Sequence, residues 1–191
     1  MNEASELNEE LNEMNETISI LISEDAIRQR VDALAAEINK DYKGKALTLV
    51  CALKGAMIFM ADLARKLDKP MAVNFDFVGT SSYGEGATST GKVRLTKDLD
   101  FDPAGRHILL IEDILDTGYT LTFLQKHISA KSPASLKVCC LLDKPDRRIV
   151  HEAMADYIGF PIPDQFVVGY GLDYAQRYRN LPYIGVLNIQ G

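Results

Sequence analysis

The sequence predicts an α/β fold in which a central, mostly parallel β-sheet is flanked by helices. Short apolar segments typical of strands alternate along the chain with amphipathic segments of helical length. Several strand segments, among them ALTLVCAL at 46–53, are apolar throughout, as expected of strands that are buried on both faces. Ligands of such folds bind beyond the carboxyl ends of the strands.

The first half of the chain contains two predicted helices and two predicted strands. An amphipathic helix is expected from residue 23, because apolar residues recur at helical spacing and a glycine follows where the helix would stop: Ile27, Val31, Leu34, Ile38 and Gly44. The strand at 46–53 comes next, followed by a helix over 56–69 that Pro70 would end. Residues 71–79 have the pattern of the second strand.

The second half continues the alternation. Its one predicted helix covers 120–129, and its predicted strands lie at 106–112, 135–142, 166–171 and 183–189. Between the two halves, residues 80–105 are rich in Gly, Ser and Thr and are longer than an ordinary connection. We expect this segment to be either a disordered loop or a functional lid.

Composition and charge limit the classes of function. Hydrophobic residues make up 47% of the chain and charged residues 25%, which is the usage of a folded protein. We expect one domain over 1–191, with residues 1–15 as an acidic extension. The net charge of −6 provides no basic field for nucleic acid. There is neither a secretory signal nor an apolar run of membrane-spanning length, so we expect a cytoplasmic protein with no membrane partner.

The three cysteines carry no metal or disulfide pattern. Cys51, Cys139 and Cys140 lie inside apolar strand segments and do not have the spacing of metal ligands. We expect them to be buried free thiols.

The segment IEDILDTGYT at 111–120 carries the chemistry. It lies between a predicted strand and a predicted helix, so its Gly-Thr turn would form the helix N-terminus. There, unpaired backbone N–H groups and the two threonine hydroxyls favour the binding of a phosphate. The residues of this turn are Asp116, Thr117, Gly118, Tyr119 and Thr120. The adjacent acids Glu112 and Asp113 suit the hydroxyls of a ribose, either directly or through a divalent cation. The segment therefore predicts a site for a sugar phosphate.

A purely structural role for this turn stays open, because an acidic Gly-Thr turn can simply cap a helix. Two related phosphate motifs do not match. The three-residue spacing of Asp113 and Asp116 differs from that in haloacid-dehalogenase-type phosphatases, whose two aspartates are separated by one residue. A Walker loop would need a lysine after Gly118, where this chain has Tyr119.

The segment LLIEDILDTGYTL resembles the phosphoribosyl-pyrophosphate signature of type I phosphoribosyltransferases, and four further segments resemble the hypoxanthine(-guanine) branch of that family. These are ALKGA, SSYGEG, LLDKP and DQFVVGYGLDYAQRYRNLPYIGV, and they occur in the family's order. The resemblance runs from about residue 16 to the C-terminus. It implies the type I phosphoribosyltransferase fold, with a small hood and with residues 80–105 as a mobile catalytic loop.

The resemblance also implies roles for individual residues. On the donor side, Lys54, Gly55 and Arg179 would bind pyrophosphate, with a cis peptide between Leu53 and Lys54. Ser82 and Tyr83 would close over the pyrophosphate as part of the mobile loop. On the purine side, Lys144 would donate to the 6-oxo group, Phe166 would stack on the base and Val167 would meet it through its backbone. Asp173 would lie at the purine site as a ligand of magnesium (Mg2+), with Glu112 and Asp113 as the other metal-site residues.

In the implied reaction, the phosphoribosyl group of phosphoribosyl pyrophosphate is transferred to hypoxanthine, which gives IMP and releases pyrophosphate. Asp116 would accept the proton from the imidazole side of the purine. A lysine donor at the 6-position favours 6-oxopurines over adenine, whereas guanine (giving GMP) and xanthine stay open as substrates. The resemblance further implies a homodimer or a homotetramer. Tyr119 departs from the family, whose members often have Lys or Asn there.

Two other classes of function compete with this enzyme. A phosphoribosyltransferase-fold regulator that binds RNA would need a basic face and would not require Lys144 or Phe166. A sugar-phosphate or nucleotide binding module without turnover would have no use for Asp116 as a base or for a lid that excludes water. A xanthine-preferring purine phosphoribosyltransferase is the alternative within the same family.

Overall fold

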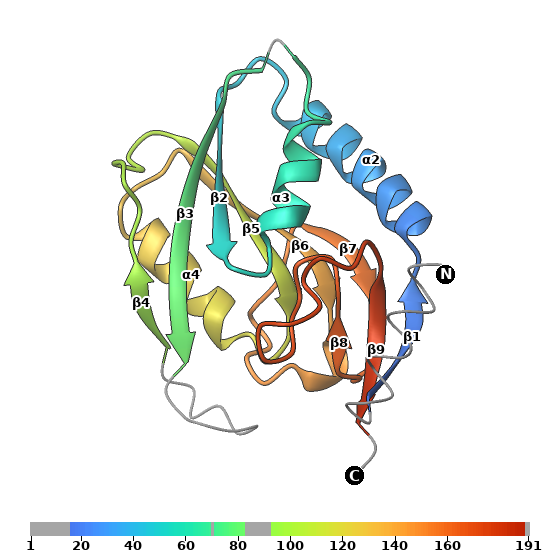
Figure 1. The fold of residues 1–191 in the computed structure, drawn as a ribbon. Coiled ribbons are helices and arrows are strands. Elements are labelled where there is room, and N and C mark those ends of the chain that lie inside the picture. Colours follow the sequence, from blue (N-terminus) through green and yellow to red (C-terminus); the bar gives the residue numbers. More distant parts are fainter. Residues whose placement is uncertain (1–15, 70, 83–92, 190–191) are drawn as a thin grey trace.

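A computed structural model describes residues 16–69, 71–82 and 93–189 of the chain (Figure 1). In chain order the elements are β1 (Glu16–Ile22), α2 (Glu24–Asp41), β2 (Leu47–Leu53), α3 (Met57–Ala64), β3 (Val73–Ser82), β4 (Val93–Lys97), β5 (His107–Leu115), α4 (Tyr119–Ser129), β6 (Ser135–Asp143), the 3-10 helix η1 (Pro145–Arg147), β7 (Tyr157–Pro161), β8 (Val167–Val168) and β9 (Ile184–Ile189). The strands form a six-stranded and a three-stranded sheet.

The six-stranded sheet has the order β4-β3-β2-β5-β6-β7. Strands β3, β2, β5, β6 and β7 run parallel, and β4 pairs antiparallel with β3 at one edge. The prediction of a central, mostly parallel sheet is therefore confirmed. Because parallel strands end at the same edge, the loops that follow β2, β5 and β6 come together there (Figure 1).

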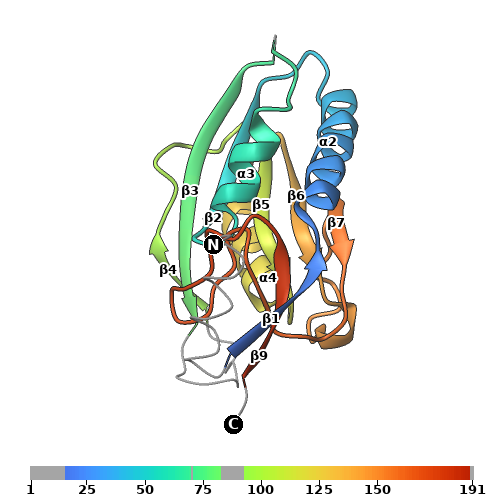
Figure 2. The ribbon, with the colours of Figure 1, turned by 45° about the vertical axis from the view of Figure 1, so that its right-hand side comes forward.

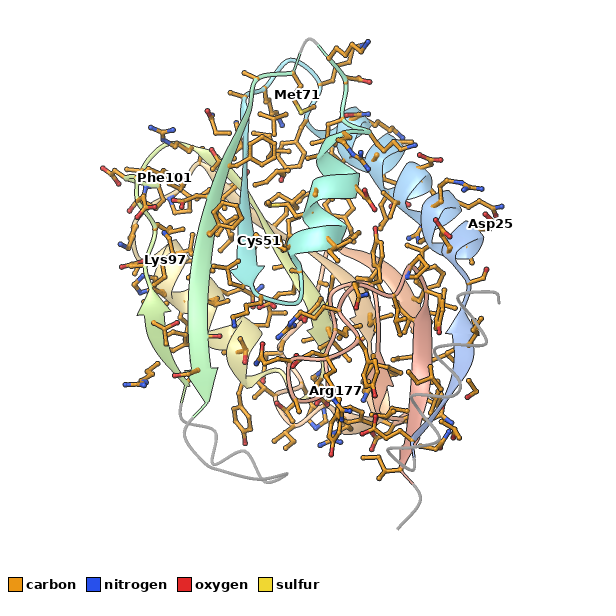
Figure 3. The ribbon with its side chains drawn as sticks, viewed as in Figure 1. Asp25, Cys51, Met71, Lys97, Phe101 and Arg177 are labelled. Carbon is orange, nitrogen blue, oxygen red and sulfur yellow. The ribbon has the colours of Figure 1, made fainter. Side chains whose placement is uncertain are left out.

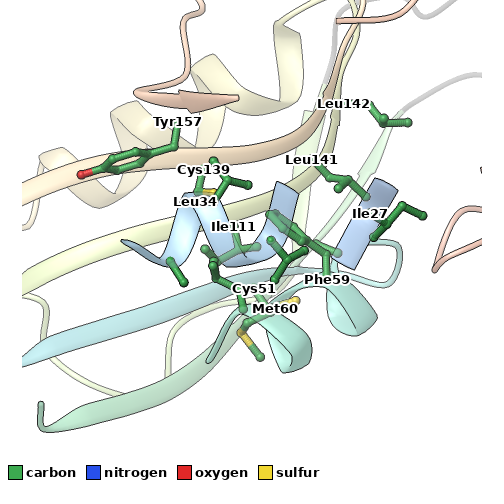
Figure 4. Close-up of a cluster of buried hydrophobic side chains, with 14 of the residues drawn as sticks. Ile27, Leu34, Cys51, Phe59, Met60, Ile111, Cys139, Leu141, Leu142 and Tyr157 are labelled. Carbon is green, nitrogen blue, oxygen red and sulfur yellow. The ribbon is translucent and has the colours of Figure 1, made fainter. Parts of the chain in front are cut away.

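Helices cover both faces of this sheet. Along β2, alternate residues belong to different apolar clusters: Leu49 and Cys51 pack with α2 and α3, whereas Val50 and Ala52 pack with α4. Figure 4 shows the first cluster, in which Ile27 of α2 and Phe59 of α3 lie beside Cys51 and neighbouring strand residues. The continuous apolar run of β2 follows from this two-sided burial.

Helix α2 forms where the apolar spacing predicts it. Ser23 caps its N-terminus, because the Ser23 side chain accepts a hydrogen bond of 3.3 Å from the Ala26 N–H. The four apolar residues at helical spacing are all buried: Ile27, Val31, Leu34 and Ile38. Helix α3 ends at Ala64, earlier than the predicted stop before Pro70.

The three-stranded sheet, in the order β1-β9-β8, joins the beginning of the described chain to its end (Figure 2). Both neighbouring pairs are antiparallel. We identify this sheet with the small hood that the resemblance implies. The predicted strands at 166–171 and 183–189 correspond to β8 and β9, although β8 is only two residues long.

Three strands were not predicted, and one of them, β4, lies within the segment 80–105 that was expected to be a loop. The three are β1 and the short edge strands β4 and β7, none of which lies in a segment that we interpreted as a strand. Within the expected 80–105 loop, residues 80–82 belong to β3 and residues 93–97 form β4. Residues 98–105 are described and form neither helix nor strand. Residues 83–92 lie outside the described residues, so the structure does not test the mobility of that part.

Two further expectations concern the thiols and the membrane. Cys51, Cys139 and Cys140 are buried and free, as predicted. None of the helices in the described ranges is long and apolar enough to cross a bilayer.

Candidate active site

The turn between β5 and α4 has the shape of an anion site because of Gly118. This residue is the N-cap of α4 and has φ of +91°, a conformation that glycine adopts without strain. A Cβ on Gly118 would also lie 2.7 Å from the Ala153 Cβ, so no side chain fits there. The first N–H groups of α4 have no partner within the helix and are available to an anion.

Residues 148–150, which follow η1, fix the conformation of this turn. The Arg148 guanidinium donates to the carbonyl oxygens of Asp116 (Nε, 2.9 Å) and Leu115 (Nη2, 3.2 Å) and pairs with the Asp143 carboxylate. The N–H groups of Ile149 and Val150 both donate to the Thr117 oxygen. The turn is therefore fixed through its backbone carbonyl groups, and these contacts do not occupy its side chains.

A cavity of about 260 Å³ opens in front of the turn. The predicted site residues that line it come from the loop after β2, the carboxyl end of β5, the turn that follows and the start of α4: Lys54, Gly55, Glu112, Asp113, Asp116, Thr117, Gly118, Tyr119 and Thr120. The structure thus brings the predicted phosphate turn and the predicted carboxylates together in one cavity.

The carboxylates of Glu112 and Asp113 differ in their partners: one Glu112 oxygen has no donor among the described residues, whereas Asp113 Oδ1 accepts a hydrogen bond of 2.9 Å from the Ile114 N–H. Glu112 is 6% exposed, and its Oε1 atom has no hydrogen-bond donor within the described part of the chain. Burial, and next the charge of Asp113, raises the pKa of Glu112 well above its usual range. Burial also raises the pKa of Asp113. Two adjacent carboxyls of this kind favour a ligand that brings hydroxyl donors or a cation.

The loop after β2 fits closely against this pair. The Leu53–Lys54 peptide is cis, as the resemblance implied. A Cβ on Gly55 would lie 1.6 Å from Asp113 Oδ2, and a Cβ on Gly171 would lie 2.0 Å from the Gly55 oxygen. Gly55 therefore lies between the end of β5 and the C-terminal loop, and both approaches require glycine.

The C-terminal loop adds charged groups at the same place. Arg179 Nη2 forms an ion pair of 2.8 Å with Asp173 Oδ1, and Arg179 Nη1 donates to the Gly171 oxygen at 2.7 Å. Lys54 Nζ donates to Gln176 Oε1 at 3.4 Å. The charges of Arg179 and Asp173 also affect the pKa of Asp113, the first lowering it and the second raising it.

The predicted purine-binding residues Lys144, Phe166, Val167 and Asp173 are not among the residues that line the 260 Å³ cavity. Lys144 is 5% exposed, and its backbone N–H donates to the Leu115 oxygen at 2.9 Å. Its Nζ lies 3.7 Å from Asp164 Oδ1. Arg147 links this group to the turn, because its side chain lies 3.0 Å from Asp116 Oδ1 and 3.4 Å from Asp164 Oδ1.

Phe166 is the one large aromatic residue that the resemblance assigned to the base. It is 53% exposed, and its ring meets the Tyr174 ring edge-on with centroids 5.7 Å apart. Val167 is buried and pairs with β9. An exposed ring beside a fixed strand is available for stacking on a planar ligand. Ser82 ends β3, and Tyr83 lies outside the described residues.

The structure does not bring Glu112, Asp113 and Asp173 into one preformed metal site. Within the ranges that the structure describes, no group of three or more His, Cys, Asp or Glu side chains could hold a metal ion. This is compatible with Mg²⁺, which commonly uses one or two carboxylates and completes its shell with waters and substrate phosphates. The unsatisfied Glu112 oxygen is consistent with such a shared site.

Comparison with known proteins identifies the family. Residues 19–175 match the model of the phosphoribosyl transferase domain. The chain belongs to this family. Its match covers the loop after β2, the β5–α4 turn, Lys144 and Asp173, whereas Arg179 lies beyond it.

Individual relatives resemble the chain over most of its length. It is 50% identical to the hypoxanthine phosphoribosyltransferase of Haemophilus influenzae, covering 88% of this chain and 94% of the relative. It is 47% identical to the hypoxanthine-guanine phosphoribosyltransferase of Mycobacterium avium, covering 89% and 85%. A crystal structure of a hypoxanthine-guanine phosphoribosyltransferase from Bacillus anthracis superposes with a TM-score of 0.84 at 43% identity, covering 91% and 99%.

Sequence reasoning missed the residues that support the site. Arg147, Arg148, Asp164 and Gln176 contact candidate site residues, yet we assigned none of them a role, although Asp164 and Gln176 lie within the segment DQFVVGYGLDYAQRYRNLPYIGV. The adjacent Arg147 and Arg148 directly after LLDKP were a usable signal, because arginines beside a predicted anion site often bind carboxylates or carbonyls.

Proposed function

We propose that the protein is a hypoxanthine(-guanine) phosphoribosyltransferase of purine salvage, which converts hypoxanthine or guanine and phosphoribosyl pyrophosphate to IMP or GMP and pyrophosphate. The observation that carries the proposal is the cavity in which a phosphate-type turn faces the buried Glu112 carboxylate, one oxygen of which has no donor in the described chain, with the Asp113 carboxylate beside it. One ligand that contains both a phosphate and a sugar satisfies both parts. The printed names of the relatives support the same reaction.

The donor would lie along the loops that line the cavity. The N–H groups and hydroxyls of Thr117 to Thr120 would bind the 5′-phosphate, and Glu112 and Asp113 would hold the ribose hydroxyls. Lys54 and Arg179, which Gln176 already joins, would receive the pyrophosphate. Breaking the bond to pyrophosphate develops positive charge on the ribose and negative charge on the leaving group, so the two sets of residues stabilise opposite ends of the transition state.

Magnesium would assist on the pyrophosphate side. We propose Asp173, with Glu112 and Asp113 through the ribose hydroxyls, as the protein groups that hold it. When bound, the ion supplies positive charge that offsets the charge growing on pyrophosphate. The resident cations Lys54 and Arg179 perform the same role from the protein.

The purine would lie between Phe166 and the β5–α4 turn. Lys144 would donate to the 6-oxo group, and the backbone of Val167 would meet the edge of the base. Asp116 would take the proton from the imidazole side and so make that nitrogen a better nucleophile. Arg147 lies 3.0 Å from Asp116 Oδ1 in the structure, so the base must share this carboxylate with Arg147 or displace it.

We also propose that the protein associates as a homodimer or a homotetramer. Helix α3 presents Met57, which is 51% exposed, next to residues that pack on the sheet. Light scattering coupled to size exclusion tests this proposal, and a monomer at micromolar concentration would contradict it.

The experiment that tests the function measures pyrophosphate release with Mg²⁺, phosphoribosyl pyrophosphate and one of hypoxanthine, guanine, xanthine or adenine. We expect turnover of 6-oxopurines and none of adenine. Asp116→Asn should lower kcat by about 10² to 10⁴-fold, the usual range for loss of a general base. The matched control is Asp146→Asn, an exposed carboxylate in the neighbouring η1.

The outcomes separate the alternatives. No turnover of any purine, with retained binding of phosphoribosyl pyrophosphate, would leave a binding module. Turnover of xanthine alone would indicate a xanthine-preferring enzyme. Binding of RNA at physiological salt without turnover would favour the regulator.

A further inference from the structure

A buried carboxylate at the start of β1 lies outside all the motifs of the active site. Glu16 is 4% exposed and accepts hydrogen bonds from two consecutive residues of the C-terminal loop. Arg177 Nη2 donates to Oε1 at 2.5 Å, and the Tyr178 hydroxyl donates to Oε2. These partners are 161 and 162 positions away along the chain. One side chain thus links the first described residue to the loop that carries Asp173 and Arg179.

The backbone of this loop needs such support. Four of its residues other than glycine have positive φ angles, of 50°, 50°, 67° and 75°: Tyr170, Ala175, Gln176 and Tyr178. Residues with a Cβ are disfavoured in this region, because the Cβ comes too close to the following carbonyl oxygen. Such a conformation persists when surrounding contacts over-determine it. Within the described loop, isolated bridges such as that between Tyr174 and Arg177 take the place of a regular strand or helix.

The two sides of the loop face different partners. On the cavity side, Gln176 Oε1 accepts from both Lys54 and Arg179, and Arg179 pairs with Asp173. On the opposite side, Arg177 and Tyr178, which lie between Gln176 and Arg179 in sequence, contact Glu16. Arg177 also lies over the Tyr174 and Tyr178 rings, 5.5 and 5.2 Å from their centroids. Figure 3 shows Arg177 within this C-terminal segment.

We infer that Glu16 is a positioning residue for the phosphoribosyl donor. It holds Arg177 and Tyr178 in place, and so keeps Gln176 and Arg179 directed toward Lys54. The inference rests on the proposed function, in which Arg179 and Lys54 receive the pyrophosphate. The β5–α4 turn is fixed separately by Arg148, so Asp116 and Lys144 do not depend on Glu16 in the same way.

The test compares Glu16→Gln with a matched control, Asp41→Asn. Asp41 also accepts from one cation and one tyrosine, Lys137 at 2.8 Å and Tyr157 at 2.7 Å. It lies at the end of α2, and its partners are near the starts of β6 and β7, at the sheet edge opposite the cavity. Both substitutions remove a charge and keep the size of the side chain.

We expect Glu16→Gln to raise KM for phosphoribosyl pyrophosphate by about tenfold or more, as the loss of a charged hydrogen-bond acceptor usually does. KM for hypoxanthine should change less than about threefold, and Asp41→Asn should change neither constant. Tyr178→Phe removes only one of the two bonds and should give an intermediate KM for the donor. Equal changes in both KM values, or an unchanged KM for the donor, would overturn the inference.

A second measurement does not depend on turnover. Amide hydrogen exchange over residues 172–180 should become at least about tenfold faster in Glu16→Gln than in the unsubstituted protein, and should not change in Asp41→Asn. Unchanged exchange in Glu16→Gln overturns the inference even if the protein is active. Inactivity of the unsubstituted protein toward every purine would instead contradict the proposed function.

Discussion

Gly55 and Asp113 approach each other so closely that a Cβ on Gly55 would lie 1.6 Å from Asp113 Oδ2. The contact joins the loop after β2, where Lys54 lies, to the carboxyl end of β5, where Glu112 and Asp113 lie. Two groups of residues that we propose to bind the donor, each at the end of a different strand, are therefore held at a fixed distance from one another. The two groups can lie this close because residue 55 is a glycine and has no side chain.

We expect Gly55→Ala to displace either Asp113 or the loop that contains Lys54, because the new Cβ would overlap with the Asp113 carboxylate. Overpacking of this kind usually costs about 1–3 kcal/mol of stability. The displacement should lower kcat/KM by about 10²-fold or more, since small errors of position are costly in catalysis. Steady-state kinetics and thermal unfolding measure both effects.

The matched control for this prediction is Gly105→Ala. Gly105 has φ of +69°, and no atom lies within 4 Å of the position that its Cβ would take, so its replacement costs backbone strain without a clash. It should lower the stability while leaving kcat/KM within about threefold. Full activity of Gly55→Ala would show that the Asp113 contact does not matter for the reaction.

A second prediction concerns the choice of purine by Lys144. An ammonium group only donates hydrogen bonds, whereas the amide of Gln can donate or accept. Lys144→Gln should therefore lower kcat/KM for hypoxanthine and permit some turnover of adenine, so that the ratio of the two falls by about 10²-fold or more. Lys131→Gln, which removes a half-buried lysine that pairs with Asp98, is the control. An unchanged ratio would remove Lys144 from base recognition.

The parts of the fold that sequence reasoning predicted are those with strong local patterns. Strands β2, β5 and β6 are central and nearly continuous in apolar residues, and α2 has a regular apolar stripe. The edge strands β4 and β7 were missed, because an edge strand is short and only partly buried. The β5–α4 turn was predicted because its glycine, hydroxyls and acids are contiguous in sequence.

The supporting contacts could not be predicted in the same way. Arg148 binds the Asp116 carbonyl across 32 residues, and Glu16 binds Arg177 across 161 residues. In each case the contact depends on the assembled sheets, so the sequence around either residue does not identify which residue is its partner. Gln176 was missed because an amide within a loop has no distinctive pattern.

A third prediction follows from the poor environment of Glu112. Its buried carboxyl has an oxygen without a donor in the described structure, so the protein without its ligand is less stable than it would be with a neutral side chain there. Glu112→Gln should stabilise the ligand-free protein by about 1–2 kcal/mol, which is an increase in Tm of about 2–8 °C for a chain of this size. It should also raise KM for phosphoribosyl pyrophosphate, because the ribose hydroxyls lose an ionised acceptor.

Differential scanning calorimetry with chelator present, and steady-state kinetics, measure these two effects. Glu152→Gln replaces an exposed glutamate and should change neither quantity. A lower Tm for Glu112→Gln would mean that the Glu112 carboxylate has adequate hydrogen-bond partners in the ligand-free protein. It would contradict the prediction that this carboxylate lowers the stability of the protein and is kept for ligand binding.

The fourth prediction uses the ion pair of Asp41 and Lys137. The hydrogen bond from Lys137, and then that from Tyr157, lowers the pKa of Asp41 below its usual value. A carboxyl whose pKa is lowered by folding stabilises the protein above its unfolded pKa, near 4, and loses this contribution as the pH falls through its folded pKa. Asp41→Asn should therefore lower the free energy of unfolding at pH 7, and the difference from the unsubstituted protein should shrink as the pH falls toward 3.

Urea unfolding at pH 7, 5 and 3 measures the difference directly. Asp25→Asn is the control, because Asp25 and Arg28 form an exposed i,i+3 pair, with side chains 72% and 60% exposed, that contributes little. Its effect should be small at all three pH values. Because Asp41 lies at the sheet edge opposite the cavity, the loss of its charge should leave turnover unchanged at pH 7. A destabilisation by Asp41→Asn that is as large at pH 3 as at pH 7 would show that packing, and not the charge, links α2 to β6.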